Sequence, residues 1–251
     1  EESHEKSVSD TYLVWGWAEN GSKPEKNIPS PKLAPAIGIH RRVKQADGQR
    51  SVLFVTVTGP QYSIRFISMP VGSQFEDYFD WQLRFLGANS ERLRSNIIFR
   101  PLHIDYGWGF KKRISDKFPD VNWDDGRPFR QRLKSSRIVV LDNPITTFLE
   151  TLVANVPTVL FWDRDRWEFR SQAEPHFENL RKAGILCDTP EEATAKLESI
   201  YDDPWVWWGS QSVQDTRQNF VKRYALSSKD WASHWAGALK NEMDLYQAAN
   251  V

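Results

Sequence analysis

RIVVLDNPITTFLETLVANVPTVLFWD, residues 137–163, is the stretch that decides the fold. Its first part is an apolar, β-branched run that predicts a strand over 137–142, and a second such run predicts a strand over 157–162. Between them, residues 147–154 carry apolar side chains at helical spacing. Strands that are apolar throughout are typical of parallel sheets covered by helices on both faces, so the stretch predicts a β–α–β unit.

The sequence on both sides of this unit continues the alternation of strands and helices. Apolar or β-branched runs predict further strands over 12–17, 51–58, 96–100 and 185–187. Apolar spacing and capping signals predict helices over 75–86, 108–118, 129–134, 171–183, 190–201, 210–225 and 228–247. The polar residues 1–10 are expected to be disordered, and residues 18–36 to cross the surface as an irregular segment. The chain is therefore predicted to be an α/β protein that binds ligands at the carboxyl ends of its strands.

The composition excludes several classes of protein. Lys plus Arg and Asp plus Glu both number 33, so a general electrostatic attraction to nucleic acid or to an anionic membrane is not expected. The single cysteine, Cys187, excludes a disulfide framework and a cysteine-based metal site. No apolar run approaches the roughly 20 residues of a membrane span. The N-terminus has no apolar signal segment and no initiator Met, so we expect the chain to be processed or cut from a longer one.

Tryptophan is the unusual residue, with 12 present in 251 positions where average usage predicts about three or four. Trp162 and Trp167 flank four charged residues after an expected strand, where they either line a ligand cleft or fold over the sheet edge. The others that stand out lie in the closing helices and are expected to pack in the core: Trp205, Trp207, Trp208, Trp231 and Trp235. The excess alone is weak evidence for carbohydrate binding.

The turn after the 137–142 strand is the first candidate binding site. The first turn of the following helix offers free backbone N–H groups and the positive end of the helix dipole, which suit a phosphate. Asn143, Thr146 and Thr147 could add donors, and Glu150 could accept from ribose hydroxyls. The alternative is a capping box formed by Thr147 and Glu150, which needs no ligand. Taken alone, the spacing favours the capping box.

The segment after the 96–100 strand gathers five functional side chains: Arg100, His103, Asp105, Tyr106 and Trp108. An arginine can hold a phosphate bidentately, and a histidine can exchange a proton near neutral pH. Asp105 could orient His103 or accept a proton, and the rings of Tyr106 and Trp108 could stack on a base or a sugar. The alternative is a surface loop with a salt bridge between Arg100 and Asp105.

Gly59, after the 51–58 strand, could let a ligand approach the backbone closely, although a simple strand end is the favoured interpretation. No spacing of His or Cys indicates a protein-bound metal, so a metal-independent protein without a cofactor is expected. The sequence also lacks a P-loop, a G-x-G-x-x-G fingerprint and a G-x-S-x-G elbow.

The order of features in residues 137–163 resembles the nucleotide-binding end of a GT-B-type glycosyltransferase: strand, turn, hydroxyl residues, a helix with Glu150, then Ala154-Asn-Val-Pro157 and a strand. More narrowly, the chain resembles the C-terminal part of a family of bacterial surface-carbohydrate transferases. That likeness rests on Trp15-Gly16-Trp17, Asp105-Tyr-Gly-Trp108, Thr146-Thr-Phe-Leu-Glu150, Pro157-Thr158, Phe161-Trp162, Trp167-Glu168 and Trp207-Trp208.

The resemblance implies a Rossmann-like parallel sheet with helices on both faces, of the GT-B C-terminal-domain type. Residues 1–30 would be an N-terminal tail and connecting segment, and 31–251 a domain that binds a nucleotide sugar. Its phosphates would lie near Thr146 and Thr147, with Arg100 or His103 close by, and its ribose near Glu150. A separate N-terminal Rossmann-like domain would hold the acceptor.

The resulting hypothesis is the donor-binding half of a cytoplasmic glycosyltransferase that transfers a sugar to a surface polysaccharide or a related carbohydrate acceptor. The inner face of the membrane is an alternative site of action. His103 and Asp105 are its candidate catalytic residues, and neither nucleic acid nor a membrane span is expected. One alternative keeps the fold but changes the reaction, to a polyol-phosphate transferase or a sugar-nucleotide epimerase. Another is a non-catalytic carbohydrate-binding domain.

Overall fold

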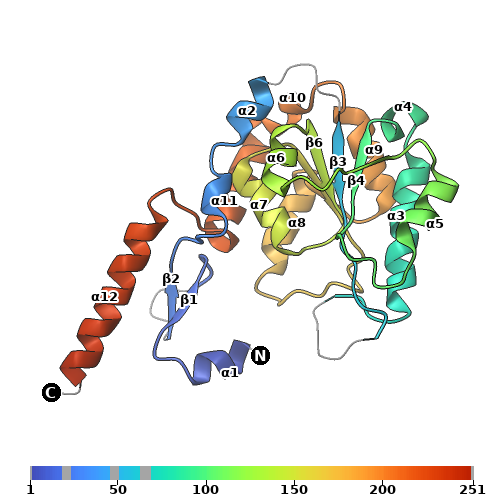
Figure 1. Ribbon diagram of the computed structural model, residues 1–251. Helices are drawn as coiled ribbons and strands as arrows, with labels where there is room; N and C mark the ends of the chain where they lie inside the picture. The colour runs from blue at the N-terminus through green and yellow to red at the C-terminus, as the bar shows by residue number, and fades with distance from the viewer. Residues whose placement is uncertain (1, 19–23, 46–50, 63–68, 250–251) are drawn as a thin grey trace.

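The computed structural model describes residues 2–18, 24–45, 51–62 and 69–249 (Figure 1). Its centre is a six-stranded sheet whose neighbouring strands are all parallel. In spatial order the strands are β5 (Asn122–Trp123), β4 (Ile97–Arg100), β3 (Val52–Val55), β6 (Ile138–Leu141), β7 (Thr158–Phe161) and β8 (Leu186–Cys187). The apolar runs over 51–58, 96–100, 137–142 and 157–162 therefore form the four inner strands of a parallel sheet.

The order of the strands reverses once, between β3 and β6. These two strands pair from Val52 and Ile138 to Val55 and Leu141. The chain runs outward from β3 through β4 and β5, and then returns to β6 on the other side. This doubly wound order defines Rossmann-like folds, in which a crevice for ligands opens at the reversal. The predicted parallel, Rossmann-like α/β fold is confirmed.

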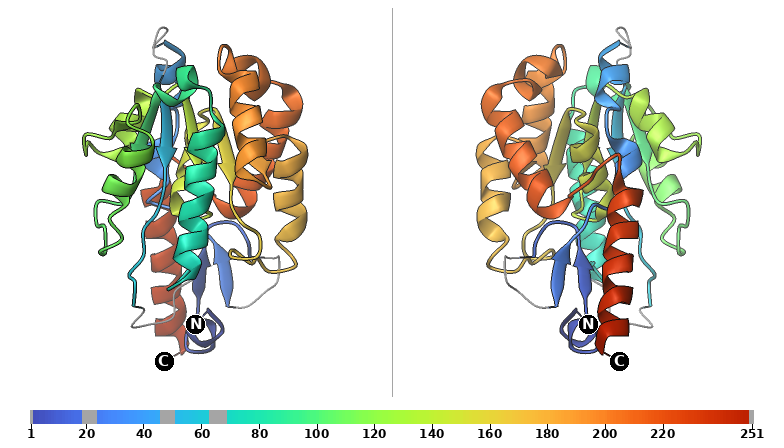
Figure 2. Two further views of the ribbon diagram at one scale, coloured as in Figure 1. Left: turned by 90° about the vertical axis from the view of Figure 1, so that its right-hand side faces the viewer. Right: turned by 90° about the vertical axis from the view of Figure 1, so that its left-hand side faces the viewer.

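Helices cover both faces of the sheet (Figure 2). One face carries α3 (Gln74–Ala88), α4 (Glu91–Arg94), α5 (Phe110–Lys117) and α9 (Pro190–Ile200). The other carries η1 (Ala34–Ala36), α2 (His40–Gln45), α6 (Phe129–Lys134), α7 (Thr146–Ala154), α8 (Glu174–Lys182), α10 (Pro204–Trp208) and α11 (Gln211–Tyr224).

Alternate strand residues enter two hydrophobic cores, one on each face of the sheet. In β3, Leu53 and Val55 join the core beneath α7, whereas Val52 and Phe54 join the core beneath α3. The second core is rich in aromatic rings, and the centroids of Phe54 and Phe85 lie 4.7 Å apart. Because side chains fill both cores, room for a ligand is confined to the edge where the strands end.

The two ends of the chain lie together outside this three-layer body (Figures 1 and 2). They comprise α1 (Glu2–Ser7), a parallel pair of strands β1 (Tyr12–Val14) and β2 (Glu25–Asn27), and the long helix α12 (Trp231–Ala249). The Trp235 indole N–H donates to the Pro29 carbonyl at 2.9 Å, and the Thr11 hydroxyl donates to Glu242 at 2.8 Å. These contacts fasten α12 to the N-terminal segment.

Most predicted elements are confirmed within a few residues, and the exceptions are short or terminal. Residues 1–10 were expected to be disordered, but residues 2–7 form α1, which ion pairs support. Residues 12–17 give only the three-residue β1, in a separate sheet. Strand β2 and η1 interrupt the expected irregular segment 18–36, of which residues 19–23 lie outside the described part.

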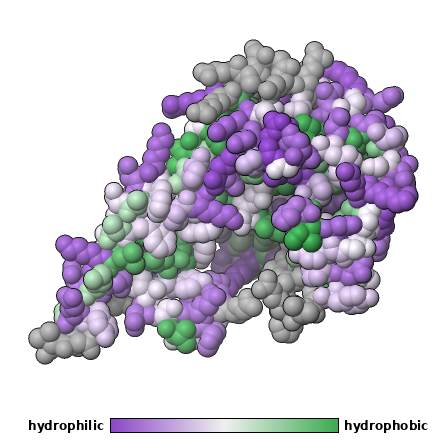
Figure 3. Space-filling model, in the orientation of Figure 1, coloured by the Kyte–Doolittle hydropathy of each residue, from purple (hydrophilic) through white to green (hydrophobic). Residues whose placement is uncertain are grey.

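Within the described ranges, no helix has both the length and the apolar character needed to cross a bilayer. The surface in Figure 3 is largely hydrophilic over the three-layer body, whereas hydrophobic residues gather along α12. Leu239, Met243 and Leu245 of this helix are more than half exposed.

Candidate functional site

A cleft of about 850 Å³ opens at the carboxyl ends of β3, β4, β5 and β6. It therefore lies where the strand order reverses, which is where doubly wound sheets bind their ligands. Among the residues that line it are six of the ten predicted site residues: Arg100, His103, Asp105, Asn143, Thr147 and Glu150. Two segments 40 positions apart in the sequence thus contribute to one site.

Helix α7 begins at the cleft without a side-chain cap. Its N-cap is Ile145, in an extended conformation, and Thr146 and Thr147 are its first two residues. The capping-box interpretation is therefore wrong, because Thr147 lies inside the first turn rather than before it. The Phe148 N–H donates to the Ile145 carbonyl at 3.1 Å. Because Ile145 and Thr147 both line the cleft, the positive end of the helix dipole lies at its wall, which favours an anion there.

Asn143 shapes the turn that leads into α7. Its Oδ1 accepts from the Ile145 N–H at 3.3 Å, and its Nδ2 donates to Asp142 Oδ1 at 2.9 Å. The side chain is 3% exposed. Asn143 lines the cleft, but the structure shows its amide engaged in holding the turn.

Glu150 is a buried carboxylate in the cleft lining. Its Oε1 accepts from Arg130 Nε, and Arg130 also donates to the Lys32 carbonyl at 2.8 Å. The ion pair compensates the charge that burial would otherwise penalise. A buried acceptor at this position, one turn along α7 from Thr147, suits the hydroxyl groups of a ligand.

Arg100 lies on the opposite wall and is held by a neighbouring acid. Its Nη1 contacts Asp124 Oδ2 and donates to the Arg127 carbonyl at 3.0 Å. Asp124 also accepts from Arg132 Nε at 2.6 Å. The expected alternative, a salt bridge to Asp105, is not among the contacts of the described residues. The guanidinium group is fixed in place at the side of the cleft.

Asp105 binds backbone rather than a histidine. Its carboxylate accepts from the Gly109 N–H at 2.9 Å and from the Phe110 N–H at 3.3 Å, at the start of α5. This is helix capping, and it occupies both oxygens. His103 is an exposed side chain of the cleft wall. Asp105 therefore holds the loop, and the role of His103 in proton transfer stays a prediction.

Four predicted residues do not line the cleft: Gly59, Thr146, Tyr106 and Trp108. The Trp108 indole N–H donates to the Gly59 carbonyl at 2.8 Å, and its ring stacks on Phe75 with centroids 5.1 Å apart. A Cβ on Gly59 would lie 3.3 Å from Phe75, so packing explains the glycine. Tyr106 is 41% exposed on the loop surface. The Trp108 ring is partly buried against the core beneath α3, and its stacking on a ligand stays a prediction.

Sequence reasoning missed a polar group buried behind the cleft. The Asp142 carboxylate is 1% exposed at the end of β6, and burial raises its pKa to about 7. Tyr78 and Gln82, both on α3, donate to it. Their four-residue spacing places them on one helix face, which was the only signal in the sequence.

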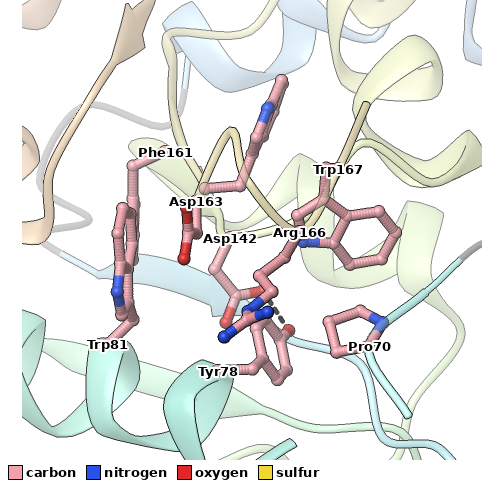
Figure 4. Close-up of a pocket in the computed structure, with 9 residues that line it drawn as sticks. Pro70, Tyr78, Trp81, Asp142, Phe161, Asp163, Arg166 and Trp167 are labelled. Atoms are coloured by element: carbon pink, nitrogen blue, oxygen red, sulfur yellow. Dashed lines mark hydrogen bonds between the residues drawn. The ribbon is translucent and has the colours of Figure 1, made fainter. Parts of the chain in front are cut away.

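Next to this group is a small second cavity of about 10 Å³, enough for one water molecule (Figure 4). Asp142, Asp163 and Arg166 line it together with the Trp167 ring. Trp162 packs against Phe177 in the core beneath α7, with centroids 6.1 Å apart. Neither tryptophan lines the large cleft, so the alternative that they do is wrong.

Together, the doubly wound sheet and the cleft at its reversal define a Rossmann-like ligand-binding domain, in which an uncapped helix N-terminus faces an arginine. The chain belongs to the LIC12162 family of transferases, whose sequence profile matches residues 1–239. This family assignment agrees with the transferase resemblance seen in the sequence. No curated protein sequence matches the chain.

Two solved structures of the wall teichoic acid polymerase TagF, one of them a point variant, are similar to this chain. Their TM-scores are 0.46 and 0.47, with 12% sequence identity in each case. The similarity covers 96% and 97% of this chain but only 60% of the polymerase.

In the part of the chain that the structure describes, no three His, Cys, Asp or Glu side chains gather as metal ligands would.

Proposed function

We propose that this chain is the donor-binding part of a glycosyltransferase that takes a sugar from a nucleotide-activated donor. The observation that carries the proposal is the position of the cleft, at the strand reversal and between the uncapped start of α7 and Arg100. A diphosphate fits between these two groups because both are anion-binding elements. The Thr147 hydroxyl adds a donor, and Glu150 accepts from the ribose.

The reaction we propose forms a bond between an acceptor oxygen and the anomeric carbon. The bond from that carbon to the phosphate oxygen breaks, and the acceptor proton passes to His103. Negative charge then grows on the leaving nucleotide phosphate. The helix dipole and the Arg100 guanidinium stabilise that charge without a metal ion.

The acceptor in this proposal is a surface polysaccharide or a related carbohydrate. It would bind on a separate N-terminal Rossmann-like domain and meet the donor at the open side of the cleft. We place the reaction in the bacterial cytoplasm, at the inner face of the membrane. These statements extend the transferase family assignment and the resemblance of residues 137–163 to GT-B enzymes.

Calorimetric titration of CMP, UDP and GDP tests the proposal, and we expect one of the three to bind. The double variant Thr147→Val, Arg100→Ala should abolish that binding while circular dichroism shows an intact fold. Arg164→Ala is a matched control, because Arg164 is an exposed arginine outside the cleft. If none of the three nucleotides binds the unaltered protein, the proposal is wrong.

A further inference from the structure

One buried carboxylate receives three hydrogen bonds behind the cleft. Asp142 Oδ1 accepts from the Tyr78 hydroxyl at 2.6 Å and from Asn143 Nδ2 at 2.9 Å. Its Oδ2 accepts from Gln82 Nε2 at 3.0 Å. Figure 4 shows the Tyr78 hydroxyl pointing at this carboxylate. The donors come from α3 and from the turn after β6, so Asp142 joins two elements.

The same network continues to both walls of the cleft. The Tyr78 oxygen accepts from the Val57 N–H at 3.1 Å, and Val57 lines the cleft just after β3. On the other side, Asn143 Oδ1 accepts from the N–H of Ile145, the N-cap of α7. The two ends of the network therefore lie just beyond β3 and β6, the two strands between which the sheet reverses.

We propose that Asp142 is a positioning residue: its carboxylate fixes the end of β3, helix α3 and the start of α7 to one another and so holds the cleft in its binding geometry. Asp142, Tyr78 and Gln82 do not line the cleft themselves. Val57, Asn143 and Ile145, at the ends of the network, do. The identity of the bound molecule rests on the proposed function, whereas the coupling between the walls does not.

The network requires the charged form of Asp142. A carboxylate accepts from all three donors, whereas a protonated acid or an amide presents a donor of its own to one of them. That donor would then be buried without an acceptor, which is costly. Burial also brings the pKa of Asp142 to about 7, so both forms occur near neutral pH. The titratable or charged groups that face it are Tyr78 on α3 and Asp163 and Arg166 after β7.

Amide NMR of the ligand-free protein tests the coupling directly. Between pH 5 and 9, the signals of Val57 and Ile145 should shift together with one apparent pKa near 7. Asp142→Asn should remove this titration. Asp163→Asn is the matched control, because it makes the same chemical change in the same cavity without a bond to the network, and it should leave the titration in place. Val57 and Ile145 signals that are the same in Asp142→Asn as in the unaltered protein at pH 9 would overturn the proposal.

Nucleotide binding provides the second test, with whichever of CMP, UDP and GDP binds the unaltered protein. At pH 8 we expect Asp142→Asn to weaken nucleotide binding at least about tenfold, because one buried hydrogen-bonding group without a partner costs roughly that much affinity. Asp163→Asn should weaken it less than about twofold. Both variants are measured with the same nucleotide at the same pH, so the charge of its phosphate groups does not affect the comparison. Equal affinities would contradict the role of Asp142.

Failure of this proposal and failure of the proposed function can be told apart. If no nucleotide binds, the proposed function is wrong, and the NMR titration still decides the role of Asp142. If Asp142→Asn does not fold, Tyr78→Phe replaces it, because it removes the hydroxyl link to Val57 and keeps the ring in the core. Tyr78→Phe should shift the Val57 signal and weaken nucleotide binding, whereas an unchanged Val57 signal and affinity would overturn the proposal.

Discussion

Arg100 forms an ion pair with Asp124 on the wall of the cleft, and Asp124 forms a second ion pair with Arg132. Two arginines thus share one carboxylate whose side chain is 6% exposed. The acid fixes the direction of the Arg100 guanidinium before any ligand arrives. Preorganised donors of this kind stabilise developing charge without rearranging.

The first prediction concerns this shared acid. Asp124→Asn should lower the free energy of unfolding by about 3 kcal/mol, because it leaves the buried Arg132 with less compensation for its charge. Urea denaturation followed by circular dichroism measures the loss. Asp125→Asn is the comparison, since Asp125 also contacts Arg132 but is exposed, and its loss should be smaller. Equal losses for the two variants would contradict the importance of burial here.

The second prediction concerns Glu150 as an acceptor from ribose. The unaltered protein should bind a ribonucleotide about tenfold more tightly than its 2′-deoxy counterpart, and Glu150→Gln should reduce this preference. Calorimetry with UDP and dUDP, or the matching pair of the nucleotide that binds, measures both. Glu168→Gln is the matched control, because it makes the same change at an exposed glutamate outside the cleft and should keep the preference. A preference unaltered in Glu150→Gln would remove Glu150 from the site.

The third prediction follows from the raised pKa of Asp142. The folded pKa is about 7, whereas an unfolded aspartate titrates near about 3.9. Between these values the folded protein holds a proton that the unfolded chain has released. The group therefore contributes stability that falls as pH rises from about 4 to about 7, by about 1.4 kcal/mol per pH unit. Urea midpoints against pH should show this slope in the unaltered protein and in Asp163→Asn, and lose it in Asp142→Asn.

The fourth prediction concerns the end of α7. Asn155 has φ of +56° and accepts from the Trp208 indole N–H at 2.8 Å. Asn155→Gly removes the side-chain acceptor, but glycine adopts the left-handed conformation without strain. Asn155→Ala removes the acceptor and also strains the backbone at this positive φ. Asn155→Ala should therefore be less stable than Asn155→Gly by about 1 kcal/mol, measured by thermal unfolding. Equal melting temperatures would show that the backbone conformation carries no strain.

The sequence predicted the strands of the inner sheet well because their apolar runs are long and buried on both faces. It missed β5 (Asn122–Trp123) and β2 (Glu25–Asn27) because neither contains an apolar run, whereas the equally short β8 does and was predicted. The helices α2, α4 and α10, with six, four and five residues, were also missed. Periodicity reveals an element only when the element is long enough to repeat.

The candidate site divides in a similar way. The position of the cleft follows from the strand order, so the residues just after β4 and β6 could be selected from the sequence. The role of each of these residues could not be predicted from the sequence. Trp108 donates a hydrogen bond to the Gly59 carbonyl, 49 positions away, and Asp142 accepts one from Tyr78, 64 positions away. Contacts over such separations appear only when the chain is folded.

The joining of α12 to the N-terminal segment has a consequence for the order in which the chain assembles. The contacts between Trp235 and Pro29 and between Thr11 and Glu242 span 206 and 231 positions. During synthesis, which proceeds from the N-terminus, Thr11 and Pro29 are made well before α12 and must wait for that helix to gain these partners. The sheet can close before α12 exists, so these two contacts can form only after the strands of the sheet have been made.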